Sequence, residues 1–157
     1  MRLWRIATET RKYPAKDLSG TGAAVSPGRW NDDGEHVVYS SPTIALAVLE
    51  TAAHVDTTGL PLNRFLVAID VPDGVWNARK SLTVATLPPT WAGIPPGVSS
   101  VQIGSDWLKA GTSAILMVPS VIVPEEFNTL INPKHPDSSG ITAKPVRPFQ
   151  YNQLFRA

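Results

Sequence analysis

The stretch 28–54 constrains the fold most, because it predicts a loop, a strand and a helix in direct succession. The strand is expected at residues 36–40 and the helix at about 42–55. Ser41 is a good N-cap, and Pro42 suits the first helical position, where its missing N–H costs nothing. At about 100° per residue, the apolar residues of this helix cover one wide arc. The segment therefore predicts an amphipathic helix packed on a sheet.

Three polar side chains mark this unit: Arg29 in the loop, Tyr39 at the end of the strand and Glu50 at the edge of the apolar arc. A strand that leads directly into a helix can bring such groups together at its end. An arginine can hold a phosphate, an aromatic ring can stack on a flat ring, and a carboxylate can stabilise a ribosyl cation. The ordinary alternative makes Glu50 a boundary residue paired with His54, four positions later.

Composition limits the function classes. The 157 residues suit one domain, expected to span 1–157, and the net charge of +1 provides no electrostatic footprint for nucleic acid or an anionic membrane. The chain has no cysteine, which excludes disulfides and cysteine-ligated zinc and agrees with a cytoplasmic location. The three histidines lack ligand spacing, so no metal is expected. We also expect no membrane span and no signal peptide.

The rest of the chain alternates short apolar runs with proline- and glycine-rich loops, which favours an α+β domain. Further strands are expected at 3–7, 65–71, 114–119, 127–131 and 149–155, and a further helix at 99–110, ended by Gly111. The long loop 8–35 matches neither common phosphate-binding motif. Arg5, on the first strand, is either solvated or directed at a ligand. Ser120, at a bend between two strands, either caps its own turn or serves a site.

The residues named above resemble the RES-domain toxins, a family named for an arginine, a glutamate and a serine. The matching residues are Arg29 in GRWN, Tyr39 in VVYSS, Glu50 in ALAVLE and Ser120 in LMVPSVIVPEEFNTLINPKHP, and the resemblance extends from about residue 3 to 148. It implies a single α+β domain with an ADP-ribosyltransferase-like fold, a split and mostly antiparallel β core with flanking helices.

The resemblance also implies an activity: a toxin that degrades intracellular NAD by cleaving the nicotinamide–ribose bond, with water or inorganic phosphate as acceptor. Glu50 would stabilise the ribosyl cation, Arg29 would grip the pyrophosphate or ribose, and Tyr39 would stack on nicotinamide. Ser120 would donate to a phosphate or ribose oxygen, and Arg5 would be a further ligand for phosphate or ribose. NAD would be the substrate, with no other cofactor.

The implied partner is a helix-turn-helix antitoxin that covers the active site in the cytoplasm. A homodimer and a larger assembly with the antitoxin both stay open. One alternative function is an ADP-ribosyltransferase that modifies a specific host protein; another is a non-catalytic binding module. Arginine-modifying transferases carry Gln/Glu-x-Glu, whereas Val48 and Leu49 precede Glu50 here, which favours NAD breakdown over transfer to arginine.

Overall fold

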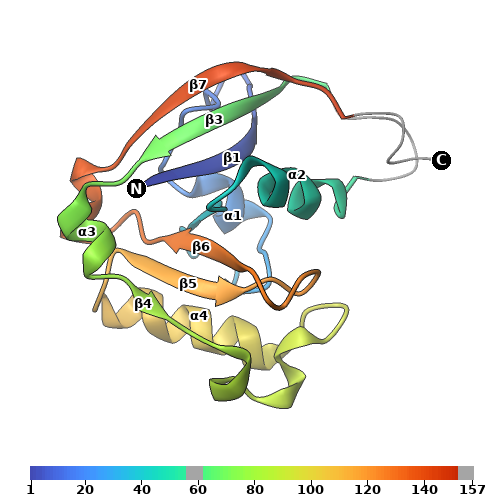
Figure 1. Ribbon diagram of the computed structural model, residues 1–157, viewed down its shortest axis with the longest axis vertical. Helices are drawn as coiled ribbons and strands as arrows, with labels where there is room; N and C mark the ends of the chain where they lie inside the picture. The colour runs from blue at the N-terminus through green and yellow to red at the C-terminus, as the bar shows by residue number, and fades with distance from the viewer. Residues whose placement is uncertain (56–61, 152–157) are drawn as a thin grey trace.

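The computed structural model describes residues 1–55 and 62–151 (Figure 1). Strands and helices are mixed along this part of the chain, as expected for an α+β protein. The strands are β1 Arg2–Thr8, β2 Val38–Ser40, β3 Arg64–Asp70, β4 Lys80–Ser81, β5 Ile115–Pro119, β6 Phe127–Ile131 and β7 Thr142–Phe149. The α-helices are α1 Thr21–Val25, α2 Ile44–Ala52, α3 Asp73–Asn77 and α4 Val98–Ala110. Short 3-10 helices occupy Val84–Thr86, Pro89–Ala92 and Pro136–Gly140.

The β core is split into two sheets, as the resemblance implied. The first has the order β1-β3-β7 and is antiparallel throughout. The second has the order β2-β6-β5-β4 and is antiparallel except for the parallel pair β4–β5. An isolated bridge joins the sheets, in which the backbones of Trp4 and Ser41 exchange hydrogen bonds of 2.8 and 2.9 Å. Figure 1 shows the two sheets one above the other, with α4 beyond the second.

The main core lies between the sheets. Successive strand residues point to opposite faces, so each sheet directs alternate side chains inward. Those that meet in this core are Leu3, Val67 and Ile69 from the first sheet and Val38, Ile115 and Ile131 from the second.

Each sheet also buries its other face. On the first sheet, Ile6 and Leu66 pack against Ala47 of α2. On the second, Leu116 and Leu130 belong to a tryptophan-rich cluster with Trp30, Trp91 and Trp107. Burial of α2 on one sheet and α4 on the other holds both helices against the β core.

The helix boundaries differ slightly from the sequence expectation. α2 begins at Ile44 because Thr43, not Ser41, is the N-cap: its Oγ1 accepts a hydrogen bond of 3.1 Å from the backbone N–H of Leu46. Ser41 is instead held in the bridge between the sheets. For α4 the expected stop is confirmed, since Gly111 adopts a left-handed φ of 59° directly after the helix.

The strand expected at 149–155 was wrong in its described part, 149–151. The strand in that region is β7, which ends at Phe149; Gln150 and Tyr151 lie outside any strand, and 152–155 lie outside the described residues. Pro145 and Pro148 concealed β7 from pattern reading. Proline is tolerated there because β7 is an edge strand, whose outer N–H groups have no ladder partner. In the part of the chain that the structure describes, no helix is long and apolar enough to cross a bilayer.

Candidate active site

The Glu50 carboxylate is held by two side chains that are distant in sequence. Its Oε1 accepts hydrogen bonds of 2.6 Å from Ser120 Oγ and 2.6 Å from Asn128 Nδ2. The ring of His54 lies 2.8 Å from the backbone carbonyl oxygen of Glu50, not from the carboxylate. The Glu–His side-chain pair of the ordinary alternative is therefore not formed, and the carboxylate points toward the β5–β6 connection.

Ser120 caps its own turn, which is one of the two alternatives considered for it, and also contacts Glu50. It follows β5 directly, is buried, and its Oγ accepts hydrogen bonds of 3.1 Å from the backbone N–H groups of Ile122 and Val123. The same hydroxyl donates its proton to Glu50. It thus caps its own turn while fixing the carboxylate, and in this structure its proton is directed at Glu50, not at a ligand oxygen.

Asn128 is a candidate site residue that sequence reasoning missed, since its amide donates to the Glu50 carboxylate. It lies within β6, and its Oδ1 accepts a hydrogen bond of 2.7 Å from Ser41 Oγ. A signal was present, since asparagine is depleted from strands and this one interrupts the apolar run FNTLI. Its partner was not visible in the sequence, because Glu50 lies 78 positions away.

Arg29 is anchored by a loop from another part of the chain. Its Nη1 donates to the backbone carbonyls of Trp91, at 2.9 Å, and Gly93, at 2.7 Å. Burial lowers the pKa of Arg29, while the charge of Glu50 and the nearby Tyr39 oppose that shift. The guanidinium therefore lies within electrostatic reach of both other candidate residues. In residues 1–55 and 62–151, neither its Nε nor its Nη2 has a hydrogen-bond partner.

Tyr39 uses its hydroxyl to hold the loop that carries Arg29. The hydroxyl donates to Asn31 Oδ1 at 2.8 Å and accepts from the backbone N–H of Trp30 at 3.1 Å. Gly28 lies directly against it: a Cβ at Gly28 would be 2.7 Å from the Tyr39 oxygen. Burial raises the pKa of Tyr39 well above its usual range, so the phenol is neutral. What it can offer a ligand is its ring.

Asn31 is a second residue that sequence reasoning missed, because it lies in the long loop 8–35, for which no strand or helix was predicted. It is fully buried, and its Oδ1 accepts from the backbone N–H of Gly28 at 2.9 Å as well as from Tyr39. Its amide donates to the carbonyls of Ala23 at 2.9 Å and Glu35 at 3.1 Å. Asn31 thus fixes both ends of the Arg29 loop and the tyrosine beside it.

Arg5 lies apart from these contacts. It lies on the opposite face of β1 from Trp4 and Ile6, the face that Leu3 and Ala7 direct at the second sheet. Its Nη1 donates to the backbone carbonyl of Asp17 at 3.0 Å, and burial lowers its pKa while Asp17 opposes the shift. The solvated alternative was wrong, and this hydrogen bond places Arg5 against the first loop.

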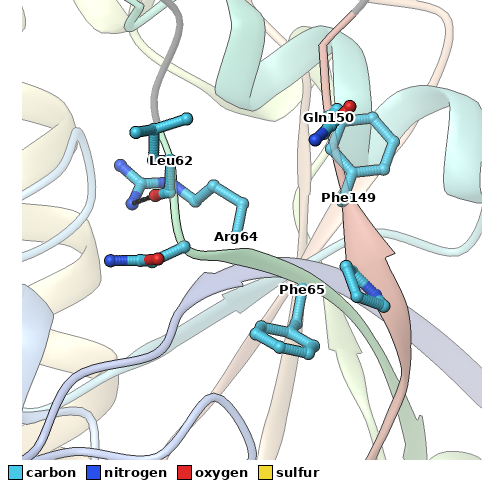
Figure 2. Close-up of a pocket in the computed structure, with 7 residues that line it drawn as sticks. Leu62, Arg64, Phe65, Phe149 and Gln150 are labelled. Atoms are coloured by element: carbon cyan, nitrogen blue, oxygen red, sulfur yellow. Dashed lines mark hydrogen bonds between the residues drawn. The ribbon is translucent and has the colours of Figure 1, made fainter.

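A small hollow lies elsewhere, between the start of β3 and the end of β7 (Figure 2). Its volume is about 180 Å³, and it is lined by Leu62, Asn63, Arg64, Phe65, Pro148, Phe149 and Gln150. Among the described residues, no hydrogen bond or ion pair joins this lining to Glu50 or Arg29, and we treat the hollow as separate from the candidate site. In the described ranges, no group of three His, Cys, Asp or Glu side chains could hold a metal ion.

Comparison with known proteins shows which family the chain resembles. The family model described as RES domain matches residues 2–152. The chain is 51% identical over 149 residues to the Prs ADP-ribosylating toxin of Sphingobium sp. (strain YBL2), covering 95% of this chain and 92% of that protein. It is 38% identical to Toxin Res of Photorhabdus laumondii over 137 residues, covering 87% and 85% of the two chains. Toxin Res of Yersinia enterocolitica is 34% identical, with 86% of each chain covered.

A solved structure shares the fold. A chain of the M. tuberculosis MbcT-MbcA toxin-antitoxin complex superposes with a TM-score of 0.61 at 15% sequence identity, covering 99% of this chain and 86% of that chain. The expected α+β fold is thereby confirmed. From the matched residues and the relatives' identities, this chain belongs to the RES-domain family of toxins.

Proposed function

We propose that this protein is a toxin that cleaves the bond between nicotinamide and ribose in NAD. The observation that carries the proposal is the Glu50 carboxylate, which two 2.6 Å hydrogen bonds hold by one oxygen within electrostatic reach of Arg29. The second oxygen, Oε2, has no hydrogen-bond partner among residues 1–55 and 62–151. A fixed carboxylate with one oxygen available is what a developing cation needs.

Cleavage places positive charge on the ribose. The bond between ribose C1 and the ring nitrogen of nicotinamide breaks, and its electron pair passes to that nitrogen and neutralises its positive charge. No general acid is required for this departure. The charge that develops on C1 and the ring oxygen resembles the oxocarbenium ion of glycosidases, which a nearby carboxylate stabilises. Because the two donors already orient Glu50, little reorganisation is needed during the reaction.

The other residues would bind the rest of the dinucleotide. The Nε and Nη2 atoms of Arg29 can make the paired, charge-assisted bonds that a pyrophosphate or ribose accepts, while Nη1 stays on the carbonyls of the 91–93 loop. The ring of Tyr39 would stack on nicotinamide. Arg5, held near Asp17, is a further candidate for a phosphate or ribose oxygen.

The group that accepts the ADP-ribose separates two candidate functions: NAD breakdown, by water or by phosphate, and transfer to a protein. In hydrolysis, the water oxygen bonds to C1 and its proton is released to solvent; in phosphorolysis, a phosphate oxygen takes the same position. A relative at 51% identity carries the name ADP-ribosylating toxin, which favours transfer to a protein side chain as the second candidate. All three reactions begin with the same bond cleavage and require the same carboxylate.

The test is a product assay. Purified protein incubated with NAD should release nicotinamide, and mass spectrometry would separate ADP-ribose, ADP-ribose 1-phosphate and a modified protein from added lysate. Glu50→Gln is the matched variant, because the glutamine carbonyl can accept the same two hydrogen bonds without the charge. We expect its turnover to fall by about 100-fold or more at a nearly unchanged melting temperature. NAD that survives high enzyme concentration, with and without phosphate and lysate, would exclude the proposal.

We further propose an antitoxin as the partner, acting in the cytoplasm. A structural neighbour is a chain of a toxin–antitoxin complex, which supports this expectation. A helix-turn-helix antitoxin that covers the active site should abolish nicotinamide release when it is purified together with this chain. Full activity of the assembled complex would contradict an occluding partner.

A further inference from the structure

The geometry around Glu50 contains a chain of side chains that extends beyond the carboxylate. Glu50 Oε1 accepts from Asn128 Nδ2 at 2.6 Å, and Asn128 Oδ1 in turn accepts from Ser41 Oγ at 2.7 Å. Ser120, in the connection between β5 and β6, donates to the same Oε1. Both donors therefore act on one oxygen of the carboxylate.

The Glu50 carboxylate determines which way the Asn128 amide faces, and Ser41 holds the amide in that orientation. A carboxylate only accepts, so the amide nitrogen must face Glu50, and the amide oxygen on the other side accepts from the Ser41 hydroxyl. A flipped amide would bring its oxygen against the carboxylate oxygen. Ser41 itself is rigid, because it is 2% exposed and its backbone makes both bonds of the bridge to Trp4. Ser41 thus anchors the amide oxygen to a backbone that is itself held in place.

The chain of contacts lies where the two sheets are joined. Ser41 directly follows β2 and Asn128 belongs to β6, two strands that pair through Ser40 and Thr129. The bridge to Trp4 connects this point to β1 of the first sheet. The carboxylate on α2 is therefore connected to both sheets, through Asn128 to the second and through Ser41 to the first. Paired strands hold these contacts more rigidly than a loop would.

We propose that Asn128 is a positioning residue for the cleavage of NAD and that Ser41 acts through it by holding the amide. The inference rests on the proposed function and extends it to two residues outside the Arg–Glu–Ser set. Two donors on Oε1 stop rotation of the carboxylate and direct Oε2 at the substrate. Orientation of this kind matters, because a reacting group displaced by about 1 Å can lose about 100-fold in rate.

The experiment compares Asn128→Ala, Ser41→Ala and Asn132→Ala by steady-state nicotinamide release and thermal melting. Losing a hydrogen bond to a charged group predicts a fall in kcat of about 10- to 100-fold for Asn128→Ala, with the KM for NAD within about twofold. Ser41→Ala leaves the amide nitrogen on Glu50 but removes the anchor of the amide oxygen, so its kcat should fall less, by about 3- to 10-fold.

Asn132→Ala is the matched control. Asn132 is a buried asparagine directly after β6, but it bonds the Leu108 carbonyl at 3.3 Å and the Lys134 N–H at 3.1 Å, away from Glu50. It should lower the melting temperature and leave kcat unchanged. In a Glu50→Gln background, Asn128→Ala should cause little further loss, because it acts only through the carboxylate.

The outcomes separate the two proposals. If wild-type protein releases no nicotinamide, the proposed function and this inference both fail. If wild-type protein is active and Asn128→Ala or Ser41→Ala keeps a kcat within twofold of it, only the positioning role is overturned. Should Asn128→Ala not fold, Ser41→Ala decides, since it leaves both donors of Glu50 present. The positioning role is also overturned if either variant shows a raised KM, a lowered kcat and a lowered melting temperature together, because any destabilised variant would show the same.

Discussion

Gly104 in α4 offers the sharpest test of the packing that supports the site. Glycine inside a helix usually destabilises a protein by roughly 0.5–1 kcal/mol relative to alanine, so Gly→Ala is ordinarily favourable. At Gly104 a Cβ would be 1.7 Å from the carbonyl oxygen of Trp30 and 2.6 Å from its carbonyl carbon. Both are backbone atoms, which cannot rotate away. We therefore expect the opposite sign for Gly104→Ala.

The magnitude follows from that distance. Ordinary contact begins at 3.4 Å, so a separation of 1.7 Å requires α4 or the Trp30 loop to withdraw by a comparable amount. Such a movement would open the cluster in which Trp30, Trp91 and Trp107 pack together. Overpacking of a core costs about 1–3 kcal/mol and sometimes more, and loss of the tryptophan contacts adds to it. We expect destabilisation of about 3 kcal/mol or more, a large part of a domain's usual stability.

Urea denaturation followed by tryptophan fluorescence measures this change. Gly22→Ala in α1 is the control, because a Cβ there meets nothing within 4 Å and should be neutral or slightly stabilising. A Gly104→Ala variant as stable as wild type would refute the argument from close contact. In any Gly104→Ala protein that stays folded, the KM for NAD should rise, since Trp30 is adjacent to Arg29.

Three further variants test the groups around the site. Burial raises the pKa of Tyr39, so above about pH 10 the phenol ionises in the unfolded chain before it does in the folded protein, and stability falls by up to about 1.4 kcal/mol per pH unit. Tyr39→Phe should reduce this dependence of stability on pH in urea titrations at pH 8–11. An unchanged dependence would count against burial of a neutral phenol. In Arg29→Lys the ammonium can still reach the carbonyls of the 91–93 loop but lacks the planar fork of the guanidinium. Calorimetry should therefore show about tenfold weaker NAD binding with little change in melting temperature. Equal affinity for NAD would argue against two parallel hydrogen bonds from Arg29 to the ligand. Asn31→Ala leaves several buried groups unpaired and should cost about 3 kcal/mol or more in chemical denaturation; a loss below 1 kcal/mol would show that water replaces the amide.

Local pattern was sufficient for much of the fold. The periodicity of α2 located Glu50 at the edge of the buried face, and Gly111 ended α4 where its left-handed conformation was expected. These features depend on residues a few positions apart, which a sequence displays directly. β7 was misplaced because prolines on an edge strand obscure the alternation that marks a strand.

The environment of the carboxylate was decided by long-range pairing. Glu50 meets Ser120 and Asn128 across 70 and 78 positions, and Ser41 meets Asn128 across 87. Which strands pair, and in what register, depends on the burial of both sheets at once, and no local window contains that information. The sequence alone therefore determined which residue carries the carboxylate and on which helix it lies. The direction of its two oxygens was set only when the sheets joined at Ser41, because that junction fixes the donors around it.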